Sequence, residues 1–169
     1  MTHKICLKDN GVTMHTSEQL QDIFHRLQNH FGPQHWWPGD SPFEIMVGAI
    51  LTQNTNWQNV EKAIANLKQA GLLSLPALSS VSVEDLAEYI RPAGYYNIKA
   101  GRLRNFLTMI AEQWDGDLDF FLDQPANVLR EQLLSVKGIG PETADSMVLY
   151  AAEKPIFVVD AYTHRILHR

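Results

Sequence analysis

Apolar residues recur at helical spacing along almost the whole chain, and this periodicity constrains the fold more than any other feature. Residues 20–27, for example, place apolar side chains at i, i+3, i+4 and i+7, the pattern of an amphipathic helix. Only residues 154–159 have the local pattern of extended chain, and they are too few to form a sheet. We therefore predict an all-α fold, a compact array of short helices joined by tight loops. The expected helices cover residues 17–30, 43–51, 57–71, 82–90 and 97–110, and three more begin near Pro125, Pro141 and Asp160.

The composition excludes several classes of protein. Of the 169 residues 45% are hydrophobic, which suits one globular domain and is too many for a disordered chain. The longest apolar stretches are far shorter than the roughly twenty residues that span a bilayer, and residues 1–10 lack a signal-peptide segment. We therefore expect a cytoplasmic protein with no membrane partner. Because Cys6 is the only cysteine, the chain cannot build an intramolecular disulfide or a cysteine-ligated iron–sulfur cluster.

Charge is distributed unevenly along this chain, whose formal net charge is −5. Residues 112–131 contain six acidic side chains against Arg130 alone, whereas residues 91–110 contain basic side chains and no acidic ones. Two interpretations of the basic segment are open. It is either a solvated helix face, which is the commoner case, or a local basic face that binds a polyanion. The basic residues are Arg91, Lys99, Arg102 and Arg104.

A Gly-x-Gly turn between two expected helices is the most informative local pattern. Gly138, Ile139 and Gly140 form the turn, and Pro141 starts the next helix. Glycine allows a backbone to approach a partner closely, and amides at a helix N-terminus can hold a phosphate. Taken alone the signal is weak, because an inert helix connector has the same pattern.

Asp160 follows two valines and begins the last expected helix. From position alone, such an acid is most often an N-cap. The alternative is a carboxylate beside a sugar–phosphate backbone, where it stabilises an oxocarbenium-like sugar or activates a water molecule. This second interpretation requires the Gly-x-Gly hairpin to lie nearby.

These segments together resemble the helix-hairpin-helix (HhH-GPD) DNA glycosylases of the endonuclease III superfamily. The hairpin matches over residues 133–150 and the acid over residues 158–160. Residues 42–44, 51–55 and 92–100 also look like family segments in the family's order. The resemblance extends from about residue 36 to the end, and more weakly from residue 17. It implies base excision repair, in which a damaged base is flipped out of duplex DNA and released.

The resemblance also implies roles for single residues. Asp160 matches the catalytic aspartate, and Gln53 matches a residue that fills the gap left in the duplex. Without the family, Gln53 is simply a polar residue at a helix end. A monovalent cation could bind at the hairpin. The residues expected to contact DNA are Lys137, Gly138, Ile139, Gly140 and Thr143.

Glu142 separates two kinds of chemistry within this family. Bifunctional members have a lysine at this position, whose amine forms a Schiff base and cleaves the strand. A carboxylate cannot form an imine, so the resemblance implies a monofunctional glycosylase without lyase activity. Lys137 lies on the other side of the turn and is better placed for a backbone phosphate than for attack on the sugar.

Aromatic residues set the expected substrate. Residues 36–39, 51–57 and 137–142 are similar to the 3-methyladenine-excising branch, in which two aromatic rings sandwich the flipped base. Electron-rich indoles favour cationic or electron-poor alkylated purines. Glu142 is either a hydrogen-bonding group at the pocket floor or an exposed acid in a first helical turn. The tryptophan pair has the alternative role of a hydrophobic plug. The expected base pocket comprises Trp36, Trp37, Pro38, Trp57 and Glu142.

One spacing suggests a metal site that we do not expect. Asp160, His164 and His168 follow one another at i, i+4 and i+8, so they share a helix face and could ligate a metal. The family resemblance argues against this, and the histidines are better explained as phosphate contacts or surface residues.

We expect four segments along the chain. Residues 1–15 are an N-terminal tail, and residues 16–41 form the first helix and tryptophan loop of a second lobe. Residues 42–152 form a helical domain with the helix-hairpin-helix at 133–152, and residues 153–169 begin a C-terminal part. In the family this lobe continues in further helices, so we expect it to be incomplete and the apolar face of residues 17–30 to be uncovered. Low stability or self-association would follow, unless a C-terminal segment lies outside this sequence.

Two other functions stay open at this point. One is a non-catalytic DNA-binding module that keeps the hairpin but lacks turnover. The other is an endonuclease III-like glycosylase for oxidised or mismatched pyrimidines. Duplex DNA is the expected partner in all cases, and the sequence does not indicate protein partners.

Overall fold

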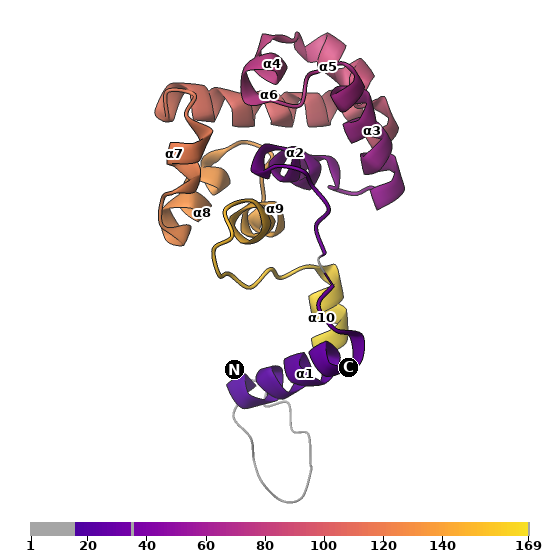
Figure 1. The fold of residues 1–169 in the computed structure, drawn as a ribbon, viewed down its shortest axis with the longest axis vertical. Coiled ribbons are helices and arrows are strands. Elements are labelled where there is room, and N and C mark those ends of the chain that lie inside the picture. The colour runs from indigo at the N-terminus through magenta and orange to yellow at the C-terminus, as the bar shows by residue number, and fades with distance from the viewer. Residues whose placement is uncertain (1–15, 35, 169) are drawn as a thin grey trace, which may run out of the picture. The chain divides into compact units, whose positions relative to one another are not determined.

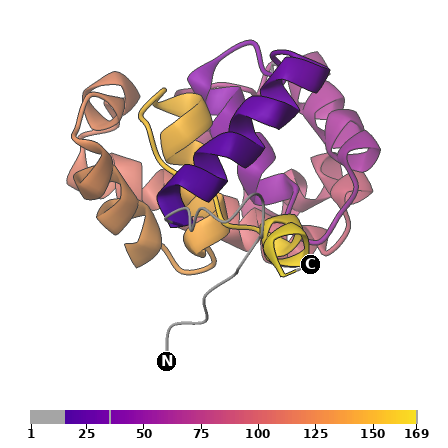
Figure 2. The same cartoon turned by 90° about the horizontal axis from the view of Figure 1, so that it is seen from below.

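A computed structural model describes residues 16–34 and 36–168 (Figures 1 and 2). Within these ranges every regular element is a helix, so the predicted all-α class is confirmed. Contacts divide the chain into two compact units, Met1–Trp36 and Trp37–Arg169. Cys6 lies outside the described residues. In the part of the chain that is described, no helix has the length and hydrophobicity needed to cross a membrane.

The first unit contains α1, Thr16–Phe31, at the position that the apolar periodicity predicts. An ion pair between Asp22 and Arg26, 2.8 Å long and one turn apart, lies on its surface. None of the residues of α1 is buried, and Phe24 and Leu27 are exposed.

The second unit contains nine α-helices among its described residues, and two of them were not predicted. Ser74 and Asp117 cap these two helices, which are too short to show an apolar period. The α-helices are α2 (Pro42–Leu51), α3 (Trp57–Gln69), α4 (Leu75–Ser80), α5 (Val83–Tyr89), α6 (Tyr96–Gln113), α7 (Leu118–Leu122), α8 (Ala126–Ser135), α9 (Pro141–Ser146) and α10 (Ala161–Leu167). A 3-10 turn η1 (Arg91–Ala93) precedes α6, and a π-helical turn η2 (Met147–Ala151) continues α9.

Helix α2 is the centre of this unit. Met46, Val47 and Ile50 have no exposed surface, and eight of the ten residues of the helix are buried. It packs against α3, α6, α9 and η2, which enclose it in Figure 1. Ser41 caps its N-terminus, accepting a hydrogen bond from the Glu44 amide over 3.2 Å. A helix that is apolar all round is stable only inside a core, so its two ends fix the loops attached to them.

Lys99, in the first part of α6, is a fully buried cation that joins two of these loops. Its Nζ donates to the carbonyl oxygen of Leu51 over 2.8 Å and to that of Ala93 over 2.7 Å. Both carbonyls lie at helix C-terminal ends, where intrahelical donors run out. Desolvation, with a smaller contribution from the charge of Arg102, lowers the pKa of Lys99 to about 8.

The basic segment at residues 91–110 is not a solvated basic face. Lys99 is buried, and Arg104 donates to the carbonyl oxygens of Ser79 and Val81 behind α4. Arg91 pairs with Glu88 on the surface. Lys99 satisfies carbonyls in the interior, so both of the interpretations made from charge alone were wrong for it, whereas Arg104 is partly buried and donates to carbonyls at the end of α4.

We expect Lys99→Met to lower the free energy of unfolding at pH 7 by about 2–4 kcal/mol, because two buried carbonyl groups lose their charged donor. The folded chain releases the Lys99 proton near pH 8 and the unfolded chain near 10.5. Between these values the unfolded state binds more protons, so the lysine adds stability as the pH rises. Urea denaturation from pH 7 to 10 should therefore show a growing difference between wild type and variant. A constant difference would contradict this account.

Candidate active site

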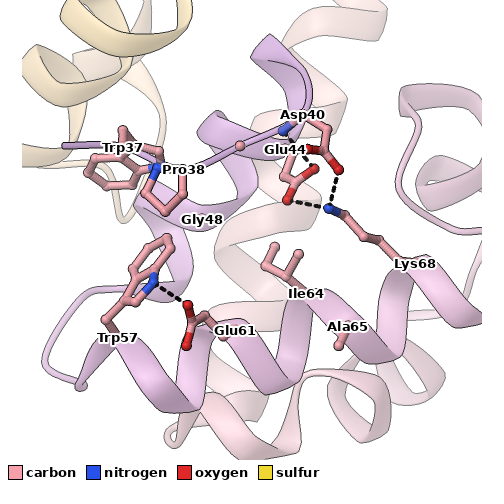
Figure 3. A pocket seen from close by; sticks show the side chains of 11 residues that line it. Trp37, Pro38, Asp40, Glu44, Gly48, Trp57, Glu61, Ile64, Ala65 and Lys68 are labelled. Carbon is pink, nitrogen blue, oxygen red and sulfur yellow. Dashed lines mark hydrogen bonds and ion pairs between the residues drawn. The ribbon is translucent and has the colours of Figure 1, made fainter. Parts of the chain in front are cut away.

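Trp37 is the middle ring of an aromatic cluster in the second unit. Its centroid lies 5.8 Å from that of Trp57, with the planes at 77°, and 5.3 Å from that of Tyr150, with the planes at 31°. The three rings come from the loop before α2, the first residue of α3 and the turn η2. Gly48 on α2 lies near the Trp37 indole (Figure 3), and a Cβ added there would lie 3.5 Å from Nε1 of Trp37. Segments far apart in sequence thus meet around one indole ring.

A pocket of about 260 Å³ opens beside Trp37 and Trp57 (Figure 3). The two indoles lie on one side of it, and acidic side chains with one lysine lie on the other. Trp37, Pro38 and Trp57, which were predicted to form a base pocket, are therefore brought together. The pocket is lined by Trp37, Pro38, Gly39, Asp40, Glu44, Gly48, Trp57, Glu61, Ile64, Ala65 and Lys68.

An ion-pair cluster attaches the tryptophan loop to the helices below it. Lys68 Nζ lies 2.7 Å from Asp40 Oδ2 and 2.8 Å from Glu44 Oε1. The buried Glu44 also accepts a hydrogen bond from the Asp40 amide over 3.2 Å. The bonds to Asp40 and Glu44 raise the pKa of Lys68, so the lysine stays charged. This cluster holds residues 37–40 against α2 and α3.

Asp160 is the N-cap of α10, as its position predicted. Its Oδ1 accepts hydrogen bonds from the amide and the hydroxyl of Thr163, each 2.7 Å long. Desolvation pushes the pKa of Asp160 upward, but the bonds from Thr163 and from nearby backbone amides outweigh it and hold the pKa below its ordinary value. The carboxylate is therefore ionised at neutral pH, and its other oxygen accepts neither of the two Thr163 bonds.

Tyr150 connects this carboxylate with the aromatic cluster. Burial, and then the charge of Asp160, raise the pKa of the Tyr150 phenol, so the group stays protonated at neutral pH. Its ring packs on Trp37. Tyr150 lies in η2, and π-helical turns often occur at functional sites. The sequence analysis missed this residue, because apolar periodicity does not distinguish a π-helical turn from an α-helical one.

The predicted hairpin joins α8 to α9. Ile139 is buried and its amide donates to the carbonyl oxygen of Val136 over 3.0 Å, which closes the turn. Gly138 has a φ of +102°, a conformation that side chains disfavour. Lys137 is exposed, and its carbonyl oxygen accepts from Asn105 of α6 over 2.9 Å. The hairpin is therefore a fixed part of the core rather than a free loop.

Gln53 ties this hairpin to the C-terminal end of α2. Its Nε2 donates to Gly138 O over 3.1 Å and to Thr143 Oγ1 over 2.9 Å, and its Oε1 accepts from Arg102. The side chain is thus more than a polar residue at a helix end. Its filling of a gap in the duplex stays a prediction.

The structure does not bring Glu142 or Trp36 into the pocket of Figure 3. Glu142 is exposed in the first turn of α9 and does not line that pocket. Trp36 ends the first unit with 71% of its surface exposed. Among residues 16–34 and 36–168, no three acidic, histidine or cysteine side chains are grouped to hold a metal ion.

We expect Gly138→Ala to destabilise the protein by about 1–3 kcal/mol, because the added Cβ meets both a positive φ and a neighbour. It would lie 2.4 Å from Cγ of Arg102, the residue that donates to Gln53. Gly140→Ala is the matched control, since its Cβ meets no atom within 4 Å. Thermal unfolding of both variants checks this, and equal losses would contradict it.

Comparisons with known proteins agree with this architecture. Residues 47–169 match the family described as "HhH-GPD superfamily base excision DNA repair protein". A Methanocaldococcus jannaschii protein provisionally named a DNA repair glycosylase is 46% identical over 153 residues, covering 90% of this chain and 70% of that protein. The chloroplastic endonuclease III homolog 1 of Arabidopsis thaliana is 32% identical over 134 residues, which cover 78% of this chain and 33% of that protein.

A solved structure shares the fold. The crystal structure of the Helicobacter pylori 3-methyladenine DNA glycosylase MagIII, bound to 1,N6-ethenoadenine, has a TM-score of 0.76 and 35% sequence identity. The match covers 89% of this chain and 71% of that one. The helical order, the hairpin between α8 and α9, and these matches together show that the chain belongs to the HhH-GPD superfamily of base excision DNA repair proteins, which includes the DNA glycosylases of the endonuclease III type.

Proposed function

We propose that the protein is a monofunctional DNA glycosylase that excises alkylated purines of the 3-methyladenine type from duplex DNA. The observation that carries this proposal is the two-tryptophan pocket, which is linked through Trp37 and Tyr150 to the ionised Asp160. The similarity to MagIII, a 3-methyladenine DNA glycosylase, supports the same substrate class.

The pocket favours a cationic purine over a neutral one. Trp37 and Trp57 line the pocket with indole rings in edge-to-face contact with each other, and an indole face attracts a positive ring through cation–π interaction. The acids at its wall are Asp40, Glu44 and Glu61, against the single cation Lys68. Methylation at a ring nitrogen makes a purine cationic, whereas undamaged bases are neutral. The excess negative charge of the pocket therefore favours the methylated purine over an undamaged base.

Asp160 is the group that we assign to the chemistry. A cationic purine leaves readily as a neutral base, so cleavage needs little acid catalysis. The charge that develops on the deoxyribose needs a carboxylate beside it, or a water molecule that the carboxylate activates. Asp160 stays ionised for either role, while the protonated Tyr150 adds no second negative charge near it.

The hairpin is the element that we propose to hold the DNA backbone. Its exposed Lys137 is a phosphate-binding side chain, and the turn at Gly138 and Gly140 allows close approach of a sugar–phosphate strand. Gln53 donates hydrogen bonds to Gly138 and to Thr143, and these bonds hold the turn in place. A monovalent cation at the hairpin carbonyls remains part of this proposal.

Asp160→Asn tests the catalytic assignment. We expect single-turnover release of 3-methyladenine from methylated duplex DNA to fall roughly 100-fold or more, because the charge is lost. Duplex binding and thermal stability should change little, since asparagine also caps a helix. Release by wild type that persists in the variant would overturn the role of Asp160. Binding without release from either protein would instead indicate a non-catalytic DNA-binding module.

The absence of a lysine at position 142 predicts that no strand cleavage accompanies base release. Borohydride added during the reaction should trap no covalent protein–DNA adduct, because Glu142 has no amine with which to form an imine. Denaturing gels should show intact strands until alkali is added. An adduct that disappears in Lys137→Gln would contradict this prediction and identify Lys137 as a nucleophile.

A second candidate is an endonuclease III-like glycosylase acting on oxidised or mismatched pyrimidines. The 32% identity with the Arabidopsis endonuclease III homolog favours it. The two candidates are separated by competing duplexes that carry 3-methyladenine or an oxidised pyrimidine. Preferential release of the pyrimidine would make the tryptophan pair incidental to substrate choice.

A further inference from the structure

Glu61 is a pocket residue that the proposed reaction does not use. Trp57 Nε1 donates a hydrogen bond to Glu61 Oε1 over 2.8 Å, one turn along α3 (Figure 3). We propose that Glu61 is a specificity-determining residue, whose carboxylate makes the Trp57 ring selective for a positively charged base. This inference rests on the proposed function, since it concerns what the same pocket prefers.

The positions of Trp57 and Glu61 on α3 are both fixed by the surrounding structure. Trp57 and Glu61 are four residues apart, so they lie on the same face of α3. Asn56 caps the helix by accepting from the Asn59 amide over 3.0 Å, and buried Val60 anchors the helix in the core. The Trp57 ring is further constrained by its edge-to-face contact with Trp37. The indole therefore presents a defined face at the pocket.

Glu61 differs from the other two acids at this pocket in the partners of its carboxylate. Asp40 and Glu44 both pair with Lys68, which neutralises part of their charge. Within the described ranges, no cationic side chain forms an ion pair with Glu61, and its hydrogen-bond donor is the neutral indole. Among the three pocket acids, Glu61 is therefore the one that does not pair with Lys68, so its full negative charge can attract a bound cation.

The hydrogen bond couples this charge to the ring. A bond from N–H to a carboxylate is charge-assisted, and it draws the proton away from the indole nitrogen. Electron density on the ring rises, and with it the attraction of the indole face for a cation. A neutral purine gains little from this change. A purely structural role, in contrast, would affect cationic and neutral ligands equally.

The test compares two nucleosides that differ in charge, 7-methylguanosine as the cation and guanosine as the neutral form. Their binding is measured by quenching of tryptophan fluorescence in the full chain. We expect wild type to prefer the cation, and Glu61→Gln, which keeps an acceptor and removes the charge, to reduce that preference roughly tenfold. Glu112→Gln removes an exposed acid from α6 and should leave the preference unchanged.

A double-mutant cycle with Trp57→Phe tests the coupling. Phenylalanine keeps a ring but cannot donate to Glu61, so Glu61→Gln should have a much smaller effect in that background. An equal effect in both backgrounds, a preference that survives Glu61→Gln, or no preference in wild type would each overturn the inference.

Release of 3-methyladenine by wild type is measured in parallel and separates the two levels of the proposal. If wild type releases the base and Glu61→Gln retains the charge preference, only the role of Glu61 fails. If wild type prefers the cation but releases no base, the pocket inference holds and the proposed glycosylase activity fails. Thermal unfolding of each variant shows whether the fold is intact.

Discussion

The burial of most of α2 is the constraint on which the rest of this structure depends. A helix with apolar side chains on every side leaves its terminal backbone groups inside the protein, and each of them needs a partner. Ser41 supplies one at the N-terminus, and the buried Lys99 supplies another at Leu51. The cost of burying a lysine is offset because the same ammonium group also satisfies Ala93. One side chain thereby holds both the loop that carries Gln53 and the turn that ends at Ala93.

The candidate site is assembled on this helix from elements that have little regular structure of their own. The tryptophan loop has no backbone ladder to hold it, so ion pairs from Lys68 to Asp40 and Glu44 attach it. On the other side of Trp37, Tyr150 enters from a π-helical turn and lies within electrostatic reach of Asp160. Packed aromatic rings thus extend from the pocket to a phenol that senses the charge of Asp160.

Much of the fold could be predicted because apolar periodicity reports directly which helix faces are buried. The helices at α2, α3 and α6, and the N-cap at Asp160, follow from local spacing alone. Short helices such as α4 and α7 depend on a single cap and carry no period. Within the site, Trp37, Pro38 and Trp57 were found through the family resemblance. Tyr150, Lys68 and Lys99 act through contacts between distant segments, which spacing along one sequence does not reveal.

The bonds of Gln53 have a mechanical consequence. They join the end of α2 to the hairpin across sequence separations of 85 and 90 residues, while Glu44 in the first turn of α2 and Gly48 further along it line the pocket. A ten-residue helix is about 15 Å long and does not stretch. Helix α2 therefore holds the hairpin and the pocket at a fixed separation. With a DNA strand bound to the hairpin as we propose, only a nucleotide extruded at the matching distance would reach the tryptophans.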